Sequence, residues 1–489
     1  MPYWFAAKTS PSNLKAIALA CLLSVAGTSE CMADAQTQVN TSAPDPQVPA
    51  DTPAPNASLA QSGLAPAVPA PEGLPPMENM ECARFDKYNT RIMSTIYLPS
   101  VCDTVAPNLF GFREFLADHG WGIQASTSPV FDYDVLNGHR GGAQYYAGQT
   151  PSAYNISNVY VTYDLSRIGF PVGAQFTGSA SNIFSDGRTG EAPVMHPAMT
   201  TMGIVQPLLD NTLELKAGYL LTIQDFVGMN LTGNAGSAAQ GLSSVIPAMA
   251  GLSVYTPTPT AEITVRDPWT KNFYNHFGIS RSVSPDGSLV ELGQNPTGFR
   301  WRTPNTKALF IDEIGYKTGM TQGGGLPVWA RAGVIYNTTN YTRFDGSVAN
   351  NNHAFYAGAT VQLTKNAHNP GGLNLDIKVD AAPSDRNFFT KDYSINLFWV
   401  GPFENRPFDM FSLGFSQTFE SRDLQSFEAA HGVQNTSTVS TDVSISYSYR
   451  VRPGIYLIST ASLVTNPGTV MAPKLPTALI VNEKIIFSF

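Results

Sequence analysis

The chain has 489 residues, of which only 13% are charged, and its formal net charge is −8. Ordinary soluble domains carry roughly 25% charged residues, so this composition is unlike theirs, and the acidic balance argues against nucleic acid as a partner. After the N-terminus no apolar run reaches about 18 residues, which excludes a transmembrane helix from the mature protein. Low charge without a long apolar run suits a β-barrel, and the 41 Gly and 36 Pro residues suit many turns.

The chain begins with two segments that we expect to lie outside the folded part. Residues 1–35 have the pattern of a signal peptide, because Lys8 and Lys15 precede the apolar run Ala16–Gly27 and Ala33-Asp-Ala35 offers a small-x-small cleavage site. Residues 36–76 are rich in Ala, Pro, Ser, Thr and Gln. Such a segment cannot bury enough apolar surface to fold, so we expect a disordered Pro/Ala-rich linker.

Residues 77–120 form a predicted periplasmic N-terminal segment with one short helix, Phe110–Asp118, which Gly120 ends. Cys82 and Cys102 are the only cysteines left after cleavage of the signal peptide. Because an exported chain enters an oxidising compartment, we expect these two cysteines to form a disulfide. Two thiolates without a nearby His make a poor metal site, so the sequence predicts no metal and no cofactor.

From Trp121 to residue 489 the chain alternates apolar and polar residues, as strands with one apolar face do. A soluble β-sandwich would alternate as well. Strands of about ten residues with aromatics at the ends of the apolar rows instead favour a transmembrane antiparallel β-barrel. The predicted strands, about sixteen in number, lie near residues 121–131, 157–165, 171–180, 199–208, 212–223, 259–266, 272–280, 307–316, 327–337, 353–364, 372–380, 392–400, 408–419, 440–451, 454–464 and 477–488.

The connections between these strands divide by length. The short connections 166–170, 209–211, 267–271, 401–407 and 452–453 fall on one side, and the longer ones, 132–156, 181–198, 224–258, 281–306 and 420–439, fall on the other. Bacterial barrels keep short turns in the periplasm and long loops outside. Counting Phe299–Arg302 as a further strand would place later short and long connections on the wrong sides, so we place it in a loop. The 224–258 loop is rich in Gly, Ala and Ser, which suits a loop folded into the channel.

The last strand, Leu479–Phe489, has an apolar row that ends on an aromatic with no tail after it. A soluble protein seldom ends on such an exposed edge, whereas a strand that closes a membrane barrel has no free edge and turns its apolar face to lipid. Glu483 interrupts the apolar row, which is tolerable near an interface. The strand ending at Phe489 also predicts an interaction with the barrel-assembly machinery.

Five segments in order resemble the carbohydrate-selective porins of the OprB type. They are Phe110-Gly-Phe-Arg-Glu-Phe-Leu-Ala-Asp-His-Gly120, Val161-Thr-Tyr-Asp-Leu-Ser-Arg-Ile-Gly-Phe-Pro171, Glu313-Ile-Gly-Tyr316, Gly401-Pro-Phe-Glu-Asn-Arg-Pro-Phe-Asp409 and Thr465-Asn-Pro-Gly468. The resemblance covers roughly residues 108–489 and departs from the family at Asp442, Tyr447 and Tyr449. It implies a sixteen-stranded channel for mono- or oligosaccharides in the outer membrane of a Gram-negative bacterium.

A sugar channel needs a constriction whose polar groups replace part of the hydration of the sugar and release it again. Charged donor–acceptor pairs suit hydroxyls, and aromatic rings suit sugar C–H faces. Alternation places these candidate residues on the lumen side: Tyr160, Asp164, Glu214, Lys216, Trp329, Arg331, Asp376, Lys378, Asp442 and Arg450. For each, the alternative is a charge solvated by lumen water. Alternation cannot place both Asp312 and Glu313 inward, and the resemblance favours Glu313. Arg406 and Asp409 are expected to form a structural pair at a turn.

The leading hypothesis is passive, saccharide-preferring diffusion through a barrel in contact with outer-membrane lipid, as a monomer or a homotrimer. A general porin without saccharide preference is the alternative. A barrel enzyme would need a Ser/His or Asp/His constellation, but none of the seven His residues lies in a nucleophile motif, so no catalytic residue is predicted. An adhesin would need longer and more varied outer loops.

Overall fold

The computed structural model describes residues 81–88, 100–138, 146–185, 196–227, 245–319, 325–367, 369, 371–434, 436–467 and 474–489. The predicted signal peptide and linker lie outside these residues. Within the described part of the chain, no helix is both long enough and apolar enough to cross a membrane.

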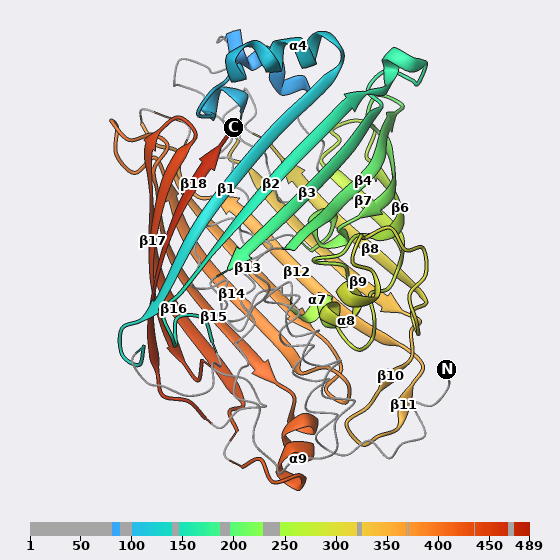
Figure 1. The fold of residues 1–489 in the computed structure, drawn as a ribbon, viewed down its shortest axis with the longest axis vertical. Helices are drawn as coiled ribbons and strands as arrows, with labels where there is room; N and C mark the ends of the chain where they lie inside the picture. The colour runs from blue at the N-terminus through green and yellow to red at the C-terminus, as the bar shows by residue number, and fades with distance from the viewer. Residues whose placement is uncertain are drawn as a thin grey trace.

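Sixteen strands within the described residues close into one antiparallel barrel (Figure 1). They are β1 Trp121–Asp134, β2 Ser152–Asp164, β3 Gln175–Ser185, β4 His196–Leu208, β5 Leu213–Leu220, β6 Thr258–Arg266, β7 Phe273–Arg281, β8 Ala308–Thr318, β9 Val328–Asn337, β12 Asn352–Gln362, β13 Leu373–Ala381, β14 Phe389–Val400, β15 Met410–Glu420, β16 Val439–Arg452, β17 Ile455–Thr465 and β18 Ala478–Ser488. A hairpin of β10 Tyr341–Thr342 and β11 Val348–Ala349 extends the loop between β9 and β12. The predicted sixteen-strand barrel is confirmed, and Phe299–Arg302 lies outside the strands.

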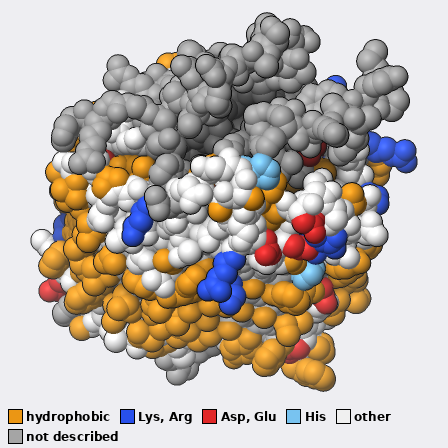
Figure 2. Space-filling model, turned by 90° about the horizontal axis from the view of Figure 1, so that it is seen from below, with side chains coloured by type: hydrophobic (Ala, Val, Ile, Leu, Met, Phe, Trp, Pro, Cys, Tyr) orange, Lys and Arg blue, Asp and Glu red, His pale blue; other side chains and the backbone are white. Residues whose placement is uncertain are grey.

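The strands turn mostly polar rows inward and mostly apolar rows outward. On β16, for example, Ser444 and Ser446 are buried in the barrel while Val443 and Ile445 are exposed on its outside. Because a membrane has no water to satisfy polar groups, the exposed apolar rows are the surface that lipid covers. Hydrophobic side chains cover the lower and left margin of the barrel when it is seen from the end away from the C-terminus (Figure 2).

The last strand closes the barrel against the first. Phe487 pairs with Thr127 in the β18–β1 register, and the Phe489 amide donates to the Ala125 carbonyl at 2.7 Å. Glu483 lies on the outward row and accepts from the Ser459 hydroxyl at 2.7 Å. Strand β18 is paired along both sides, so the barrel has no free edge there.

One end of the barrel, which we call the short-turn end, carries the short connections, the C-terminus and the N-terminal segment (Figure 1). That segment contains η2 Glu81–Tyr88, η3 Val101–Asp103, η4 Leu109–Gly111 and α4 Phe112–Asp118, and the connection after β2 contains η5 Leu165–Ile168. The Cys82–Cys102 disulfide joins η2 to η3. Asp103 then docks on the barrel, where it accepts from Arg450 Nη2 at 2.6 Å and from the Tyr456 hydroxyl.

The opposite end carries the long connections with α5 Thr222–Asp225, α7 Val245–Met249, α8 Ser288–Gln294 and α9 Arg422–Ala430. Described parts of the connection after β5 fold into the barrel, as its composition predicts. Phe226 and Ile246 belong to the same buried cluster as the inward-facing Leu309, Ile311 and Ile335 of the wall. This inserted connection narrows the lumen and brings backbone groups close to charged wall residues.

Candidate functional site

Glu313 is the centre of a polar cluster on the inner wall of β7, β8 and β12. Its side chain is buried, and its two oxygens accept hydrogen bonds from different tyrosines: Tyr274 Oη to Oε1 at 2.8 Å and Tyr356 Oη to Oε2 at 2.8 Å. Its neighbour Asp312 faces outward and accepts from Asn275 Nδ2 at 2.6 Å. Strand β8 therefore places Glu313 inside and Asp312 outside without a bulge.

Two glycines let these tyrosines reach Glu313. Gly315 pairs with Tyr274 across β7–β8, and Gly333 pairs with Tyr356 across β9–β12. A Cβ at either glycine would come closer than 3.0 Å to the facing tyrosine ring. Each ring therefore lies flat over its glycine, and its hydroxyl projects along the wall to the carboxylate. This explains physically why Gly follows Glu313 by two residues.

Arg331 lies beside this cluster and is held from two sides. Its guanidinium carbon lies 3.9 Å from the centroid of the Trp329 ring, a cation–π contact. Its Nε donates to the Val227 carbonyl of the inserted connection at 2.7 Å. Trp329 in turn donates from Nε1 to the Tyr274 hydroxyl at 2.9 Å. The Arg331 side chain is 5% exposed, and its Nη1 has no hydrogen-bond partner among the described residues.

The inserted connection is tied to the wall by consecutive residues. Asp225 Oδ1 lies 2.5 Å from Lys216 Nζ on β5, and Phe226 stacks on the His276 ring with centroids 3.9 Å apart. His276 also lies 3.2 Å from Glu262 through its Nε2. Together with the Arg331–Val227 bond, these contacts fix the connection across β5, β7 and β9, directly beside Glu313.

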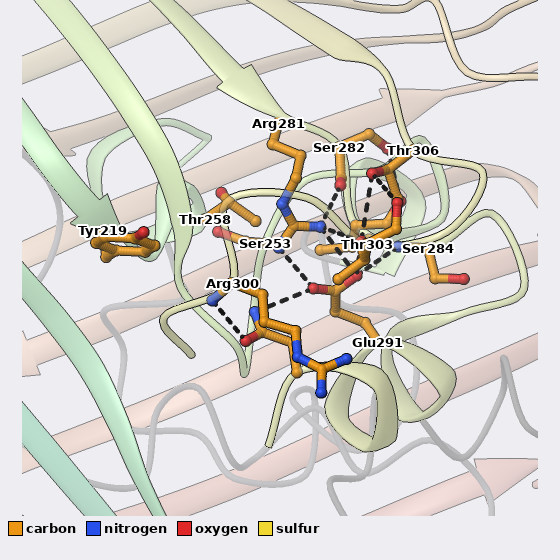
Figure 3. Close-up of polar contacts among 12 residues, drawn as sticks. Tyr219, Ser253, Thr258, Arg281, Ser282, Ser284, Glu291, Arg300, Thr303 and Thr306 are labelled. Carbon is orange, nitrogen blue, oxygen red and sulfur yellow. Dashed lines mark hydrogen bonds and ion pairs between the residues drawn. The ribbon is translucent and has the colours of Figure 1, made fainter. Parts of the chain in front are cut away.

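A second long connection, residues 282–307, is fixed by a buried ion pair (Figure 3). Arg281 and Glu291 point toward each other and form a bidentate pair, with Nη2 to Oε1 at 2.6 Å and Nη1 to Oε2 at 3.0 Å. Thr303 donates to the same Oε2 at 3.0 Å, and the Ser284 amide does so at 3.1 Å. A connection held by this many charge-assisted bonds keeps one conformation at the end of the barrel away from the C-terminus.

The lumen also contains charged residues farther around the wall. The predicted candidates that are buried on inward rows are Tyr160, Glu214, Lys216, Trp329, Arg331, Asp376, Lys378 and Asp442. Arg331, Gly358 and Lys378 follow one another across three strands, and Gly358 leaves room between the two cations. Tyr160 lies on β2, which is seven strands from β9 in the barrel order, so Tyr160 and Arg331 belong to nearly opposite parts of the wall.

Two predicted candidates lie instead at the short-turn end with structural partners. Asp164 caps η5 by accepting from the Ser166 amide at 3.1 Å. Arg450 is bound to Asp103 of the N-terminal segment. Arg406 and Asp409 form the expected pair, with Arg406 Nε 2.8 Å from Asp409 Oδ2, and this hydrogen bond raises the pKa of Arg406.

Several residues of the cluster were not among the sequence-based candidates. Tyr274 and His276 lie on the inward row of β7, so the same alternation would have found them. Tyr356 could be linked to Glu313 only with the strand register in hand. Phe226 and Val227 belong to the inserted connection, which carries no periodic signal. Within the described residues, no group of three or more His, Cys, Asp or Glu is placed to hold a metal ion.

A closed sixteen-strand barrel with a lipid-facing apolar exterior, a charged interior and a connection folded into its lumen defines a porin of the Gram-negative outer membrane. Porins are channels and not enzymes. Residues 161–489 match the carbohydrate-selective porin family, OprB, and the chain belongs to this family.

A solved structure shares the fold, and others are more distantly similar. OprB of Pseudomonas putida at high pH superposes with a TM-score of 0.64 at 16% sequence identity, covering 78% of this chain and 97% of that one. Its low-pH structure gives a TM-score of 0.47 at 14% identity, covering 79% and 98%. The outer-membrane channel DcaP of Acinetobacter baumannii gives 0.45 at 8% identity, covering 76% and 97%. No curated protein sequence matches the chain.

Proposed function

We propose that Glu313, Arg331 and the residues that hold them form the saccharide-binding constriction through which mono- or oligosaccharides diffuse passively into the periplasm. The observation that carries this proposal is the Nη1 donor of Arg331, which has no hydrogen-bond partner among the described residues, beside the doubly bonded Glu313 carboxylate. A sugar hydroxyl both donates and accepts, so a fixed guanidinium and a fixed carboxylate together satisfy it.

The arrangement suits passage better than tight binding. Each Glu313 oxygen accepts one tyrosine hydroxyl, and a carboxylate oxygen has room for a second donor. The adjacent opposite charges leave the cluster with little net attraction for a free ion. Weak hydrogen bonds that form and break in turn allow a neutral polyol to enter and leave the constriction. The other inward candidates would extend this path as a polar wall.

The test is liposome swelling with glucose, a disaccharide and a size-matched amino acid. We expect sugars to enter faster than the amino acid through the native protein. Arg331→Gln should remove most of this preference, because a hydrogen bond from a charged group contributes about 1.5–3 kcal/mol. The matched control is Lys484→Gln, which removes one cation from β18, away from the cluster. Equal sugar entry through Arg331→Gln and the native channel would refute the assignment.

Entry that depends on solute size alone would instead favour a general porin. In that case the native protein would show no difference between glucose and an amino acid of the same size. This outcome would separate failure of the saccharide preference from failure of the Arg331 assignment.

We also propose how the chain is exported and assembled. Residues 1–35 would be removed as a signal peptide, and 36–76 would remain as a linker before the periplasmic segment 77–120. The barrel-assembly machinery would recognise the strand that ends at Phe489. A mass measurement of the protein purified from outer membranes tests the cleavage, since an intact mass of 52.6 kDa would contradict it.

Between monomer and homotrimer, the outer surface favours the homotrimer. At mid-height of β1, β2, β17 and β18 the outward row contains hydrogen-bonded polar side chains: Thr127 with Asn155 and Ser157, and Ser459 with Glu483. Polar groups in this position gain from contact with protein in place of lipid. Cross-linking in native outer membranes should give a trimer, and Glu483→Leu should weaken it. A monomer alone would contradict this part of the proposal.

A further inference from the structure

The N-terminal segment exposes three phenylalanines at the short-turn end of the barrel. The side chains of Phe110, Phe112 and Phe115 are 102%, 51% and 58% exposed. They lie within six residues, on η4 and α4, next to the first strand (Figure 1). Single exposed apolar residues are ordinary, but a group of aromatic side chains on one small element marks an interaction surface.

The helix α4 has three distinct faces. Arg113 and Ala117 are buried against the rest of the segment. Glu114 is turned to another side and accepts from Arg84 Nη2 at 2.7 Å. The third face carries Phe112, Phe115 and His119, which a period of 3.6 places on one stripe. The ring of His119 lies 4.7 Å from that of Phe115, and none of the three residues of this face carries a carboxylate or an ammonium group.

The backbone before the helix is held in an unfavourable conformation to present this face. Phe110 has a φ of 58° and Leu109 a φ of 46°, both in the left-handed region that bulky residues avoid. Such a conformation is costly for a residue with a bulky side chain. No packing contact of the Phe110 side chain offsets this cost in the isolated chain, because that side chain is fully exposed. An environment that takes up the ring would offset it.

The aromatic face is fixed relative to the barrel wall. Arg113 Nη1 donates to the Ala106 carbonyl at 3.2 Å, and its Nη2 donates to the Ile123 carbonyl of β1 at 3.3 Å. Arg167 of η5 donates to the Asp118 carbonyl at 2.7 Å. Because the helix is attached to both β1 and the connection after β2, its depth is set by the depth of the barrel in the membrane.

The helix also adjoins the part of the barrel that carries exposed apolar and aromatic side chains. The first residue of β1, Trp121, lies outward and its ring is 4.6 Å from that of Tyr163 on β2, as expected of an interfacial aromatic girdle. In the adjoining connection, Ile168, Phe170 and Val172 are exposed as well. Exposed apolar side chains therefore continue from the girdle onto this connection, and Arg167 of the same connection is bonded to the end of α4.

We propose that the aromatic face of α4 and η4 inserts into the phospholipid interface on the periplasmic side of the outer membrane. Short turns face the periplasm in bacterial barrels, which places this end there. Aromatic rings on an amphipathic helix bury themselves at the boundary of headgroups and acyl chains, and a helix too short to span can still be held there. The segment would thus contact the membrane beside the barrel, directly before the chain enters β1.

The test uses the full chain in vesicles of phosphatidylethanolamine and phosphatidylglycerol. A nitroxide is attached to Phe115→Cys with Cys82–Cys102 left oxidised, and Cys21→Ser and Cys31→Ser remove the thiols of any chain that keeps residues 1–35. Collision of the nitroxide with oxygen, which concentrates in lipid, is compared with collision with a water-soluble nickel chelate. Asp118→Cys on the same helix is the matched control, and Val443→Cys and Asp345→Cys give the lipid and water references.

We expect the ratio of oxygen to nickel collisions at position 115 to be several-fold higher than at 118 and to approach that at 443. Equal, water-like ratios at 115 and 118 would overturn the proposal. Low collision with both reagents at 115 would overturn it too, because it would mean that a protein surface, such as a second copy, covers the face. Phe112→Cys repeats the measurement at a second position, so that one poorly folding variant does not decide it.

Discussion

Gly333→Ala is the sharpest single test of how the wall holds Glu313. The added methyl group would come closer than 3.0 Å to the Tyr356 ring, which packs flat over this glycine. The ring must move, so its hydroxyl leaves Glu313 Oε2. Loss of a hydrogen bond to a charged group costs about 1.5–3 kcal/mol, and overpacking adds about 1–3 kcal/mol. We therefore expect the free energy of unfolding to fall by about 2.5–6 kcal/mol.

The assay is urea-induced unfolding of the barrel in lipid vesicles, paired with sugar entry by liposome swelling. Gly319→Ala is the matched control, because nothing lies within 4 Å of a Cβ there. Tyr356→Phe removes the hydroxyl alone and should reproduce only the hydrogen-bond part of the loss. Unfolding of Gly333→Ala at the same urea concentration as Gly319→Ala, with unchanged sugar entry, would refute this account of the cluster.

Glu291→Gln should loosen residues 282–307, because it leaves the buried Arg281 without its charge partner at a cost of about 3–5 kcal/mol; faster protease cleavage between these residues checks it, and cleavage at the native rate would contradict it. Reduction of Cys82–Cys102 should expose the N-terminal segment to protease while the barrel stays folded, because the disulfide stabilises the folded segment by about 3 kcal/mol through the lower entropy of the unfolded chain. Unfolding of the barrel on reduction would contradict this prediction. The Thr270 amide holds the pKa of Asp267 below its usual range, in the turn between β6 and β7. Its contribution to stability is therefore present above the unfolded pKa of about 3.9 and is lost as pH falls toward the lower folded value. Asp267→Asn should flatten the dependence of unfolding on acid pH, and an unchanged profile would contradict the assignment.

Alternation predicted the barrel because the two faces of each strand meet different environments. Lipid requires apolar side chains outside, and water and polar loops favour polar side chains inside. Val443 and Ser444 could not exchange rows without burying a hydroxyl in lipid and exposing an apolar side chain within. The same alternation fails where strands end. At Asp164 and Arg450 the next residues turn, and period two does not distinguish a lumen residue from a cap or an anchor.

The cluster around Glu313 shows a different limit. Its position inside follows from period two once Asp312 is placed outside, but its partners depend on which residues face it across neighbouring strands. Gly315 and Gly333 are part of that arrangement, and in a sequence they look like ordinary weak points of a strand. The Val227 carbonyl that holds Arg331 is a backbone atom, so no side-chain pattern could reveal it.

The docking of Asp103 also affects how firmly the barrel is closed between β1 and β18. The Val105 amide donates to the Ser488 carbonyl at 2.8 Å, and the Gly454 amide donates to Asp103 Oδ1 at 3.2 Å. The Tyr88 carbonyl accepts from Thr162 on β2. The residues before β1 thus bridge the seam where the first and last strands meet, and the disulfide joins the two halves of that bridge. Separation of β1 from β18 therefore requires these N-terminal residues to detach as well. The segment that precedes the first strand thus stabilises a strand pairing that only the last strand completes.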